Sequence, residues 1–383
     1  MNRSAISLGR IFGIPIGLDY SWFLIFVLLT WSLASSYYPG EFANWPVAQY
    51  WIVGAATALL LFVSVLLHEL GHSLMALRYK IPVLNITLFI FGGVAQIGAE
   101  PPSAIAEFWI ALAGPIVSFA LALLFSVLQP IVGAFGPLLA LAKYLAYING
   151  TLALFNLIPG FPLDGGRVFR AIIWGTTHSL HRATLVAANV GRFIAYVFIL
   201  LGVWQMFTGN FANGLWIAFI GWFLESAAAS QVRQQTIQDL LAGHMVQDAM
   251  RRDYTVVSPE TTLEQLVDEH ILGSGRRSLI VEQASKVSGL LTLQDIKKIM
   301  RSDWPTTTAA QVMVPAEQMK RIRPDAKLVD ALAEMDRDGV NQLPVMVDDQ
   351  IHGVLSRDDV ISLLRTLSEL SKPQSPLSKP RQA

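Results

Sequence analysis

The sequence contains no cysteine and carries little charge. Of its 383 residues none is Cys and only 15% are charged, against about a quarter in soluble domains. Without cysteine there are no disulfides, iron–sulfur clusters or thiolate nucleophiles, so any zinc ion must be held by histidine and carboxylate side chains. The 28 basic and 28 acidic residues balance, which argues against a nucleic-acid partner.

Hydrophobic residues dominate the chain. They make up 53% of it, and the mean hydropathy is +0.47. A bilayer core requires about 20 consecutive apolar residues in a spanning helix. The sequence therefore predicts an integral membrane protein in the lipid bilayer. Its predicted helices lie at residues 18–36, 51–77, 105–128, 138–158, 189–208 and 212–229.

Arginine and lysine fall in every second connection between the predicted helices. Short cytoplasmic loops carry the excess of positive charge, so both termini are expected in the cytoplasm, with the protein in the plasma membrane. Lys143 is the exception, and its long side chain is expected to reach the interface by snorkelling. The residues that set the orientation are Arg3, Arg10, Arg78, Lys80, Arg167, Arg170, Arg182 and Arg233.

A His-Glu-x-x-His motif, residues 68–72, lies inside the second predicted helix. Side chains four residues apart share one helix face, so His68 and His72 are able to bind one metal ion, with Glu69 beside a water on it. Ionisable residues inside a membrane span are functional by default. The alternative is a pair of histidines that only form hydrogen bonds within the bundle.

A third metal ligand is offered at the end of the fourth predicted helix. Prolines 159 and 162 break the helix there, and non-helical backbone at membrane depth is tolerated where it is buried or lines a wet cavity. Asp164 is the candidate ligand. Alternatively, the segment is a cytoplasmic turn in which Asp164 is solvated.

Together, His68-Glu-Leu-Gly-His72 and Asn156-x-x-Pro-x-x-Pro-Leu-Asp164-Gly resemble the motifs of the site-2 protease family of intramembrane zinc metalloproteases. The resemblance implies one zinc ion per chain, held by His68, His72 and Asp164. It makes Glu69 the catalytic base and Asn156 a polar helper at the scissile carbonyl, although Asn156 has the alternative role of capping the broken helix. The implied substrate is a transmembrane protein.

Residues 85–97 alternate in character around Gly92-Gly93, which indicates a short β-hairpin. The hairpin is expected to dip into the membrane beside the site. Its edge strand would capture an unwound substrate segment by β-addition. The alternative is a re-entrant loop that fills the bundle.

After about residue 235 the composition becomes charged, and a period of about 64 residues appears. Residues 289–295 recur as 353–359. The pattern resembles a tandem cystathionine-β-synthase-type (CBS) pair, which implies a homodimer and a site for ATP, ADP or AMP. The residues placed at that site by the resemblance are Thr292, Asp295, Ser356 and Asp359. The alternative is helix capping without a ligand, because Ser or Thr followed three residues later by Asp starts a helix.

The sequence thus predicts a polytopic α-helical membrane protein with a membrane-associated β-hairpin and a C-terminal α+β tandem CBS domain. The expected domains are 1–235, 244–303 and 308–367, with a disordered tail at 368–383. The expected function is regulated intramembrane proteolysis by a zinc metalloendopeptidase, modulated through the CBS pair. Two alternatives are a CBS-gated metal transporter that uses the same site and a nucleotide sensor with an inactive protease domain. The complete set of ligands and base argues against the sensor.

Overall fold

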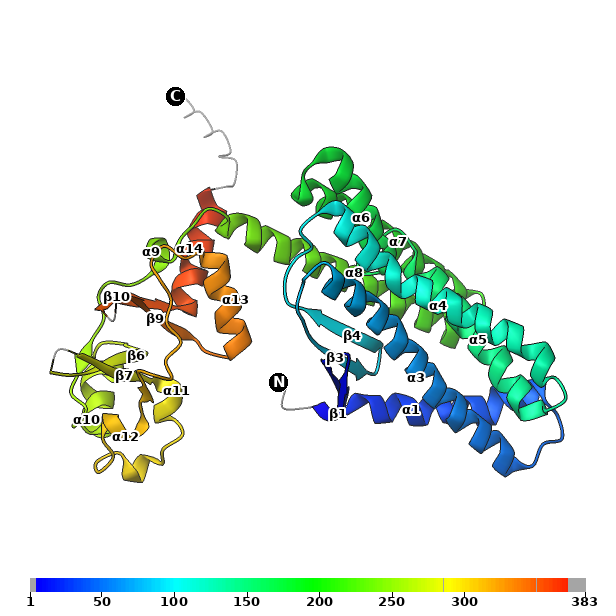
Figure 1. The fold of residues 1–383 in the computed structure, drawn as a ribbon, viewed down its shortest axis with the longest axis horizontal. Coiled ribbons are helices and arrows are strands. Elements are labelled where there is room, and N and C mark those ends of the chain that lie inside the picture. Colours follow the sequence, from blue (N-terminus) through cyan, green and yellow to red (C-terminus); the bar gives the residue numbers. More distant parts are fainter. Residues whose placement is uncertain (1–4, 285, 349, 371–383) are drawn as a thin grey trace, which may run out of the picture. The chain divides into compact units, whose positions relative to one another are not determined.

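The computed structural model describes residues 5–284, 286–348 and 350–370. The chain divides into two compact units, Met1–Gln235 and Thr236–Ala383. Figure 1 shows long helices and a small sheet in the first unit, and strands with short helices in the second. Each unit is described by itself.

Six helices in the described part of the chain are long and apolar enough to cross a membrane. Each overlaps one predicted span, so the prediction of a polytopic helical membrane protein is confirmed. Large apolar side chains such as Leu123, Leu200 and Trp204 stay exposed on these helices, as lipid contact requires. The six are Ser21–Glu41, Val47–Arg78 (α3), Ala104–Val132 (α4), Gly136–Asn156 (α5), Leu180–Phe207 (α7) and Phe211–Leu241 (α8); the first contains α1 Ser21–Ser32, a π-helical segment η1 Leu33–Tyr37 and α2 Tyr38–Glu41.

Two strands before the first span and two strands after the second span form one four-stranded sheet. The predicted hairpin is present as β3 Val83–Phe89 and β4 Gly92–Ile97. Two N-terminal strands, β1 Ala5–Ile11 and β2 Ile14–Asp19, extend it to the order β1-β2-β3-β4, with β2 and β3 parallel.

The first predicted span began too early. Residues 18 and 19 belong to β2, and Asp19 Oδ1 accepts hydrogen bonds from the Ser21 N–H at 2.9 Å and hydroxyl at 2.6 Å, so α1 starts after this carboxylate. Arg3, which the orientation argument used, lies outside the described residues.

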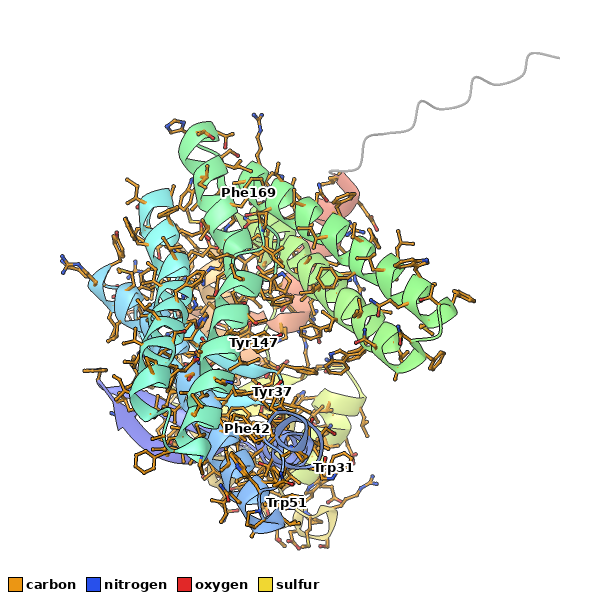
Figure 2. The ribbon with its side chains drawn as sticks, turned by 90° about the vertical axis from the view of Figure 1, so that its right-hand side faces the viewer. Trp31, Tyr37, Phe42, Trp51, Tyr147 and Phe169 are labelled. Carbon is orange, nitrogen blue, oxygen red and sulfur yellow. The ribbon has the colours of Figure 1, made fainter. Side chains whose placement is uncertain are left out.

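Aromatic side chains gather at the end of the bundle where α3 and α5 begin. Figure 2 shows Trp31, Tyr37, Phe42 and Trp51 toward this end, and Phe169 toward the other. Lys143 lies over the Phe42 ring, with Nζ 5.5 Å from its centroid. This cation–π contact explains how a lysine is accommodated here.

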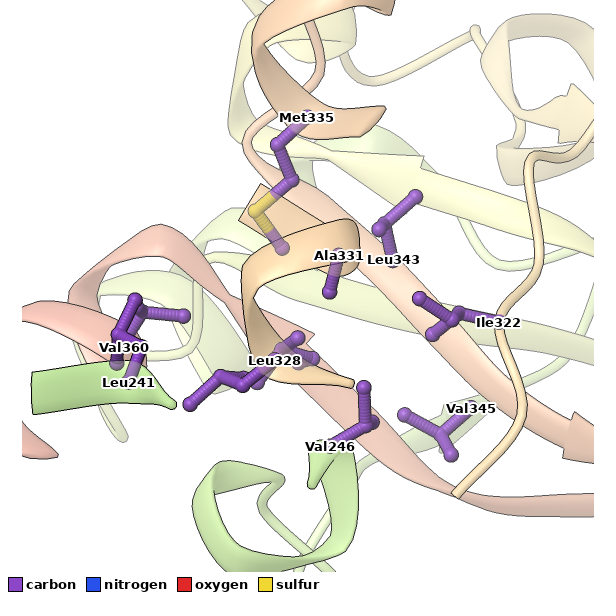
Figure 3. Close-up of a cluster of buried hydrophobic side chains, with 10 residues drawn as sticks. Leu241, Val246, Ile322, Leu328, Ala331, Met335, Leu343, Val345 and Val360 are labelled. Carbon is purple, nitrogen blue, oxygen red and sulfur yellow. The ribbon is translucent and has the colours of Figure 1, made fainter. Parts of the chain in front are cut away.

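The second unit is built from two similar α+β halves that exchange their first segments. Val246, in the first repeat by sequence, is buried in the core of the second with Leu328 and Val345 (Figure 3). In return, the Val314–Pro315 strand pairs with the first repeat's sheet. The elements are α9 Val246–Ala249, β5 Val256–Val257, α10 Leu263–Leu266, η2 Val267–Leu272, β6 Ser278–Gln283, β7 Lys286–Thr292, α11 Leu293–Ile296, η3 Arg301–Asp303, α12 Ala309–Val312, β8 Val314–Pro315, α13 Leu328–Asp338, β9 Gln342–Val347, β10 Gln350–Ser356 and α14 Arg357–Leu370.

The last helix extends three residues into the segment that was predicted to be a disordered tail. Helix α14 continues to Leu370, so residues 368–370, expected to be disordered, are helical. Its pattern of apolar residues packs Val360 and Leu364 against the core, which carries the helix past the predicted boundary. The rest of the predicted tail, 371–383, lies outside the described residues.

Candidate active site

His68 and His72 lie on one face of α3, as their spacing predicts. The helix is continuous from Val47 to Arg78 and contains no proline. Both imidazoles are buried, and their ring centroids are 4.9 Å apart. The Nε2 atoms lie 3.2 Å from each other.

Asp164 joins the two histidines from a short helix that sequence analysis did not resolve. Helix α5 ends at Asn156, and α6 Asp164–Thr177 begins after the proline-containing loop. Asp164 Oδ2 is 3.1 Å from His68 Nε2 and 3.2 Å from His72 Nε2. Gly165 and Gly166 admit no side chain, because a Cβ atom on either would collide with the loop backbone. These glycines allow the start of α6 to sit tightly on the loop.

The three ligand atoms fit a tetrahedral zinc ion. Zinc bonds of about 2.0–2.1 Å place tetrahedral ligand atoms about 3.3 Å apart, close to the 3.1–3.2 Å separations here. His72 Nδ1 is 2.7 Å from the Ile110 carbonyl oxygen, so Nδ1 carries a proton. In the neutral imidazole Nε2 then presents its lone pair to the site, which is the form that binds a metal ion.

Helix α4 supplies the outer contacts of both histidines. His68 Nδ1 is 2.9 Å from Ser118 Oγ, and His72 Nδ1 donates to Ile110. Such partners orient metal-ligating imidazoles. Gly114 faces both rings, because a Cβ atom on it would lie 2.6 Å from His68 Nε2 and closer still to His72 Nε2.

Sequence analysis missed these three α4 positions. A backbone carbonyl leaves no trace in a sequence. The available signal was the run of small residues Ala111-Leu-Ala-Gly-Pro115 in an apolar helix, which marks close helix packing.

Glu69 is half-buried and faces strand β4. A Cβ atom on Gly93 would lie 2.6 Å from Glu69 Cγ. The strand therefore packs directly on the carboxylate that follows His68.

Asn156 is the last residue of α5 and is half-buried. It stands at the break between α5 and the loop that leads to Asp164, which is where the resemblance placed it. Its role as a polar helper stays a prediction.

The four residues proposed for nucleotide binding form two helix caps. Thr292 Oγ1 lies 2.6 Å from Asp295 Oδ2, and Ser356 N lies 3.0 Å from Asp359 Oδ2. Both are capping boxes, the alternative that the sequence left open. In the first copy, Lys298 Nζ is also 2.8 Å from Asp295.

A cavity of about 260 Å³ adjoins the second cap. Ser356 and Asp359 line it, together with three arginines, whereas Thr292 and Asp295 are not among its lining residues in the described chain. A second cavity of about 420 Å³ shares Arg277 and Ser356 with the first. The arginines of the first cavity are Arg251, Arg276 and Arg277.

A bundle of membrane-length helices in which two buried histidines meet a half-buried aspartate beside a glutamate defines a metalloprotease embedded in the membrane. The family model "Peptidase family M50" matches residues 56–135 and 132–201. The chain belongs to peptidase family M50. The CBS-domain model matches residues 246–302 and 309–366, so the chain also carries tandem CBS domains.

Relatives of similar length carry matching names. Zinc metalloprotease Rip3 of Mycobacterium tuberculosis is 34% identical over 97% of this chain and 95% of its own. Zinc metalloprotease sll0528 of Synechocystis is 34% identical over 96% and 97%. The solved structure of the site-2 protease from Methanocaldococcus jannaschii is 30% identical, covers 60% of this chain and 95% of its own, and has a TM-score of 0.41. Family membership makes the chain a metalloprotease and disfavours the transporter alternative.

Proposed function

We propose that this protein hydrolyses a peptide bond in or next to the transmembrane segment of a membrane-protein substrate. The observation that carries the proposal is the convergence of His68, His72 and Asp164 atoms at 3.1–3.2 Å inside a membrane-length bundle. One zinc ion per chain fits between these atoms. Glu69, the residue after His68, is then the catalytic base.

The roles of the side chains follow from their chemistry. A zinc ion bound here supplies Lewis-acid activation of a water molecule and of the scissile carbonyl. Glu69 accepts the proton of the attacking water and delivers it to the leaving amine. Strand β4 packs on the Glu69 side chain at Gly93, which restricts where the base can point. The Asn156 amide donates to the developing oxyanion, a contact typically worth about 3–4 kcal/mol.

Strand β4 is the proposed capture site for the unwound substrate. It is an edge strand, because the sheet order ends β3-β4. Gly93 of this strand packs on Glu69, so a peptide added along the strand would run beside the base. A transmembrane helix hides its amides in its own hydrogen bonds, and β-addition satisfies them once the helix is opened.

We propose a plasma-membrane orientation with both termini in the cytoplasm. Basic residues at the end of α3, in α6 and in the first turn of α7 support it, since these positions would share one side. His72 and His68 precede Arg78 by six and ten residues, which places them about 9–15 Å along the helix from that boundary. The site is then reached from the cytoplasm.

We propose that the CBS domains bind an adenine nucleotide in the cavity beside Ser356 and Asp359. Ligand sites of this kind measure about 300–1,000 Å³. The second cavity, of about 420 Å³, lies in that range, and the first, of about 260 Å³, shares Arg277 and Ser356 with it. Arginines suit the phosphates. For Thr292 and Asp295 the described contacts are those of a helix cap. We also propose a homodimer through the CBS domains, as the resemblance to CBS pairs implies. The mass of the detergent-solubilised protein tests this oligomeric state.

The deciding experiment compares membrane-protein fragments by quantitative mass spectrometry in cells that carry wild type or Glu69→Gln at matched expression. A single-span protein cut only by the wild type supports the activity and the base, and names a substrate. If no fragment differs although the purified wild type holds zinc, proteolysis in these cells is rejected.

A further inference from the structure

A buried ion pair joins α4 to α6 outside the ligand set. Glu107 of α4 is completely buried, and Arg170 of α6 is 9% exposed. Arg170 Nε donates to Glu107 Oε1 at 2.7 Å, and Nη2 donates to the same oxygen. Arg167 Nε lies 4.0 Å from this oxygen. Glu107 Oε2 accepts no hydrogen bond from the described residues, so arginine alone compensates the buried charge.

Arg170 also contacts the loop before α6 and the helix after it, α7. Its guanidinium carbon lies 5.2 Å from the centroid of the Phe161 ring, in the loop that leads into Asp164. Nη1 lies 3.5 Å from Thr184 Oγ1 on α7. A planar guanidinium with several fixed donors suits such a junction, which a lysine ammonium would not reproduce.

Glu107 begins a face of α4 that continues along the metal site. Three, seven and eleven residues further on are Ile110, Gly114 and Ser118, which at helical spacing share one face. Ile110 and Ser118 contact the two imidazoles, and Gly114 makes room for them. The ion pair therefore anchors α6 to the same surface that orients the histidines.

We propose that Arg170, paired with Glu107, is a positioning residue that sets Asp164 in the metal-ligand set. Arg170 follows Asp164 by six residues on one short helix and holds the preceding loop through Phe161. Ligand sets tolerate displacements of only about 0.5 Å. This inference rests on the proposed metal site, in which Asp164 is a ligand.

The test measures zinc affinity of the full-length protein in detergent for Arg170→Gln, together with the visible absorption spectrum of the Co²⁺-loaded form. We expect the zinc Kd to rise about tenfold, the lower end of the effect of losing a direct outer partner of a metal ligand, because Arg170 acts on Asp164 through α6 and the preceding loop. We also expect the Co²⁺ bands to change. Arg192→Gln is the matched control. It removes a helix–helix ion pair between α7 and α8, with Arg192 Nε 3.2 Å from Glu225 Oε1, that does not touch α6. We expect it to leave Kd and spectrum unchanged.

Asp164→Asn distinguishes a failure of the proposed metal site from a failure of the positioning role of Arg170. If it leaves zinc affinity unchanged, the proposed metal site fails. If Asp164→Asn weakens zinc binding while Arg170→Gln keeps the wild-type Kd and spectrum, only the positioning role fails. A lowered melting temperature of the metal-free protein with unchanged Kd also refutes that role, since it reports a purely structural pair. Should Arg170→Gln not fold, Arg170→Lys decides, because it keeps the charge and loses the fork. A wild-type Kd in that variant refutes the proposal.

Discussion

Gly114→Ala tests whether helix α4 leaves room for the metal ion. A Cβ atom at Gly114 would lie 2.6 Å from His68 Nε2, against 3.4 Å for the onset of ordinary contact, and nearer still to His72 Nε2. The His68 ring would have to withdraw by about 0.8 Å, more than the roughly 0.5 Å that a functional site tolerates. The added methyl group would also stand between the nitrogens that face the ion.

The expected result is a zinc Kd raised at least 100-fold, which corresponds to about 2.8 kcal/mol. Isothermal titration of the metal-free protein measures it, with zinc content by mass spectrometry as a check. Helix propensity works in the opposite direction, because alanine favours a helix over glycine by about 0.8–1.0 kcal/mol. A loss of zinc binding therefore cannot be assigned to a weakened helix.

Gly150→Ala is the control for this experiment. Gly150 also lies within a spanning helix, but its Cβ would meet Ala122 Cβ at an ordinary 3.8 Å. We expect zinc affinity within about threefold of wild type. A Gly114→Ala protein that binds zinc as the wild type does would refute the geometry of α4 against the histidines.

Three further predictions concern the base, the substrate and the nucleotide. Glu69→Gln should keep the zinc content and lower turnover by about 10²- to 10⁴-fold; retained turnover would remove Glu69 as the base. Because the chain has no native cysteine, Val94→Cys on β4 should form a disulfide with one position of a cysteine-scanned substrate, and any weaker product should lie two residues away on the same face, because a disulfide requires Cα atoms within about 7 Å. Exposed Leu8→Cys on β1, the opposite edge strand, should form none; weaker products three or four residues away would contradict β-addition. Arg277→Ala should weaken ATP binding by about tenfold or more, whereas Lys298→Ala should not; the reverse order would place the ligand at the cap formed by Thr292 and Asp295.

The parts of this protein that the sequence predicted are those with local signatures. Helical spacing puts His68 and His72 on one face wherever the helix packs, and long apolar runs identify spans without knowledge of their neighbours. Asp164 was the farther inference, since it meets the histidines from another helix. It was available because prolines 159 and 162 mark a helix break at membrane depth, and because the motif from Asn156 to Asp164 resembles that of the site-2 protease family.

The N-terminal strands lacked such a signature. Each has only six or seven residues, and β2 is held by parallel pairing with β3, which aligns Ile16 with Ile86 across a whole helical hairpin. Strand propensity depends on the surface against which a strand packs. The exchange of segments between the CBS repeats could not be predicted either, because it depends on packing between the repeats. Val246 belongs to the first copy by sequence but is buried in the core of the second.

Helix α4 shows why a metal motif is only part of a metal site. In the proposed site His68, His72 and Asp164 would supply the bonds, yet the Ile110 carbonyl holds the proton of His72 on Nδ1, and the absence of a Cβ at Gly114 leaves room for both rings. These contributions come from backbone, which carries no residue type to recognise. A chain with both motifs intact but a larger residue at position 114 would therefore resemble this family in its motifs and bind zinc poorly. To infer activity from a related sequence, the residues on this face of α4 must therefore be checked as well as the metal ligands.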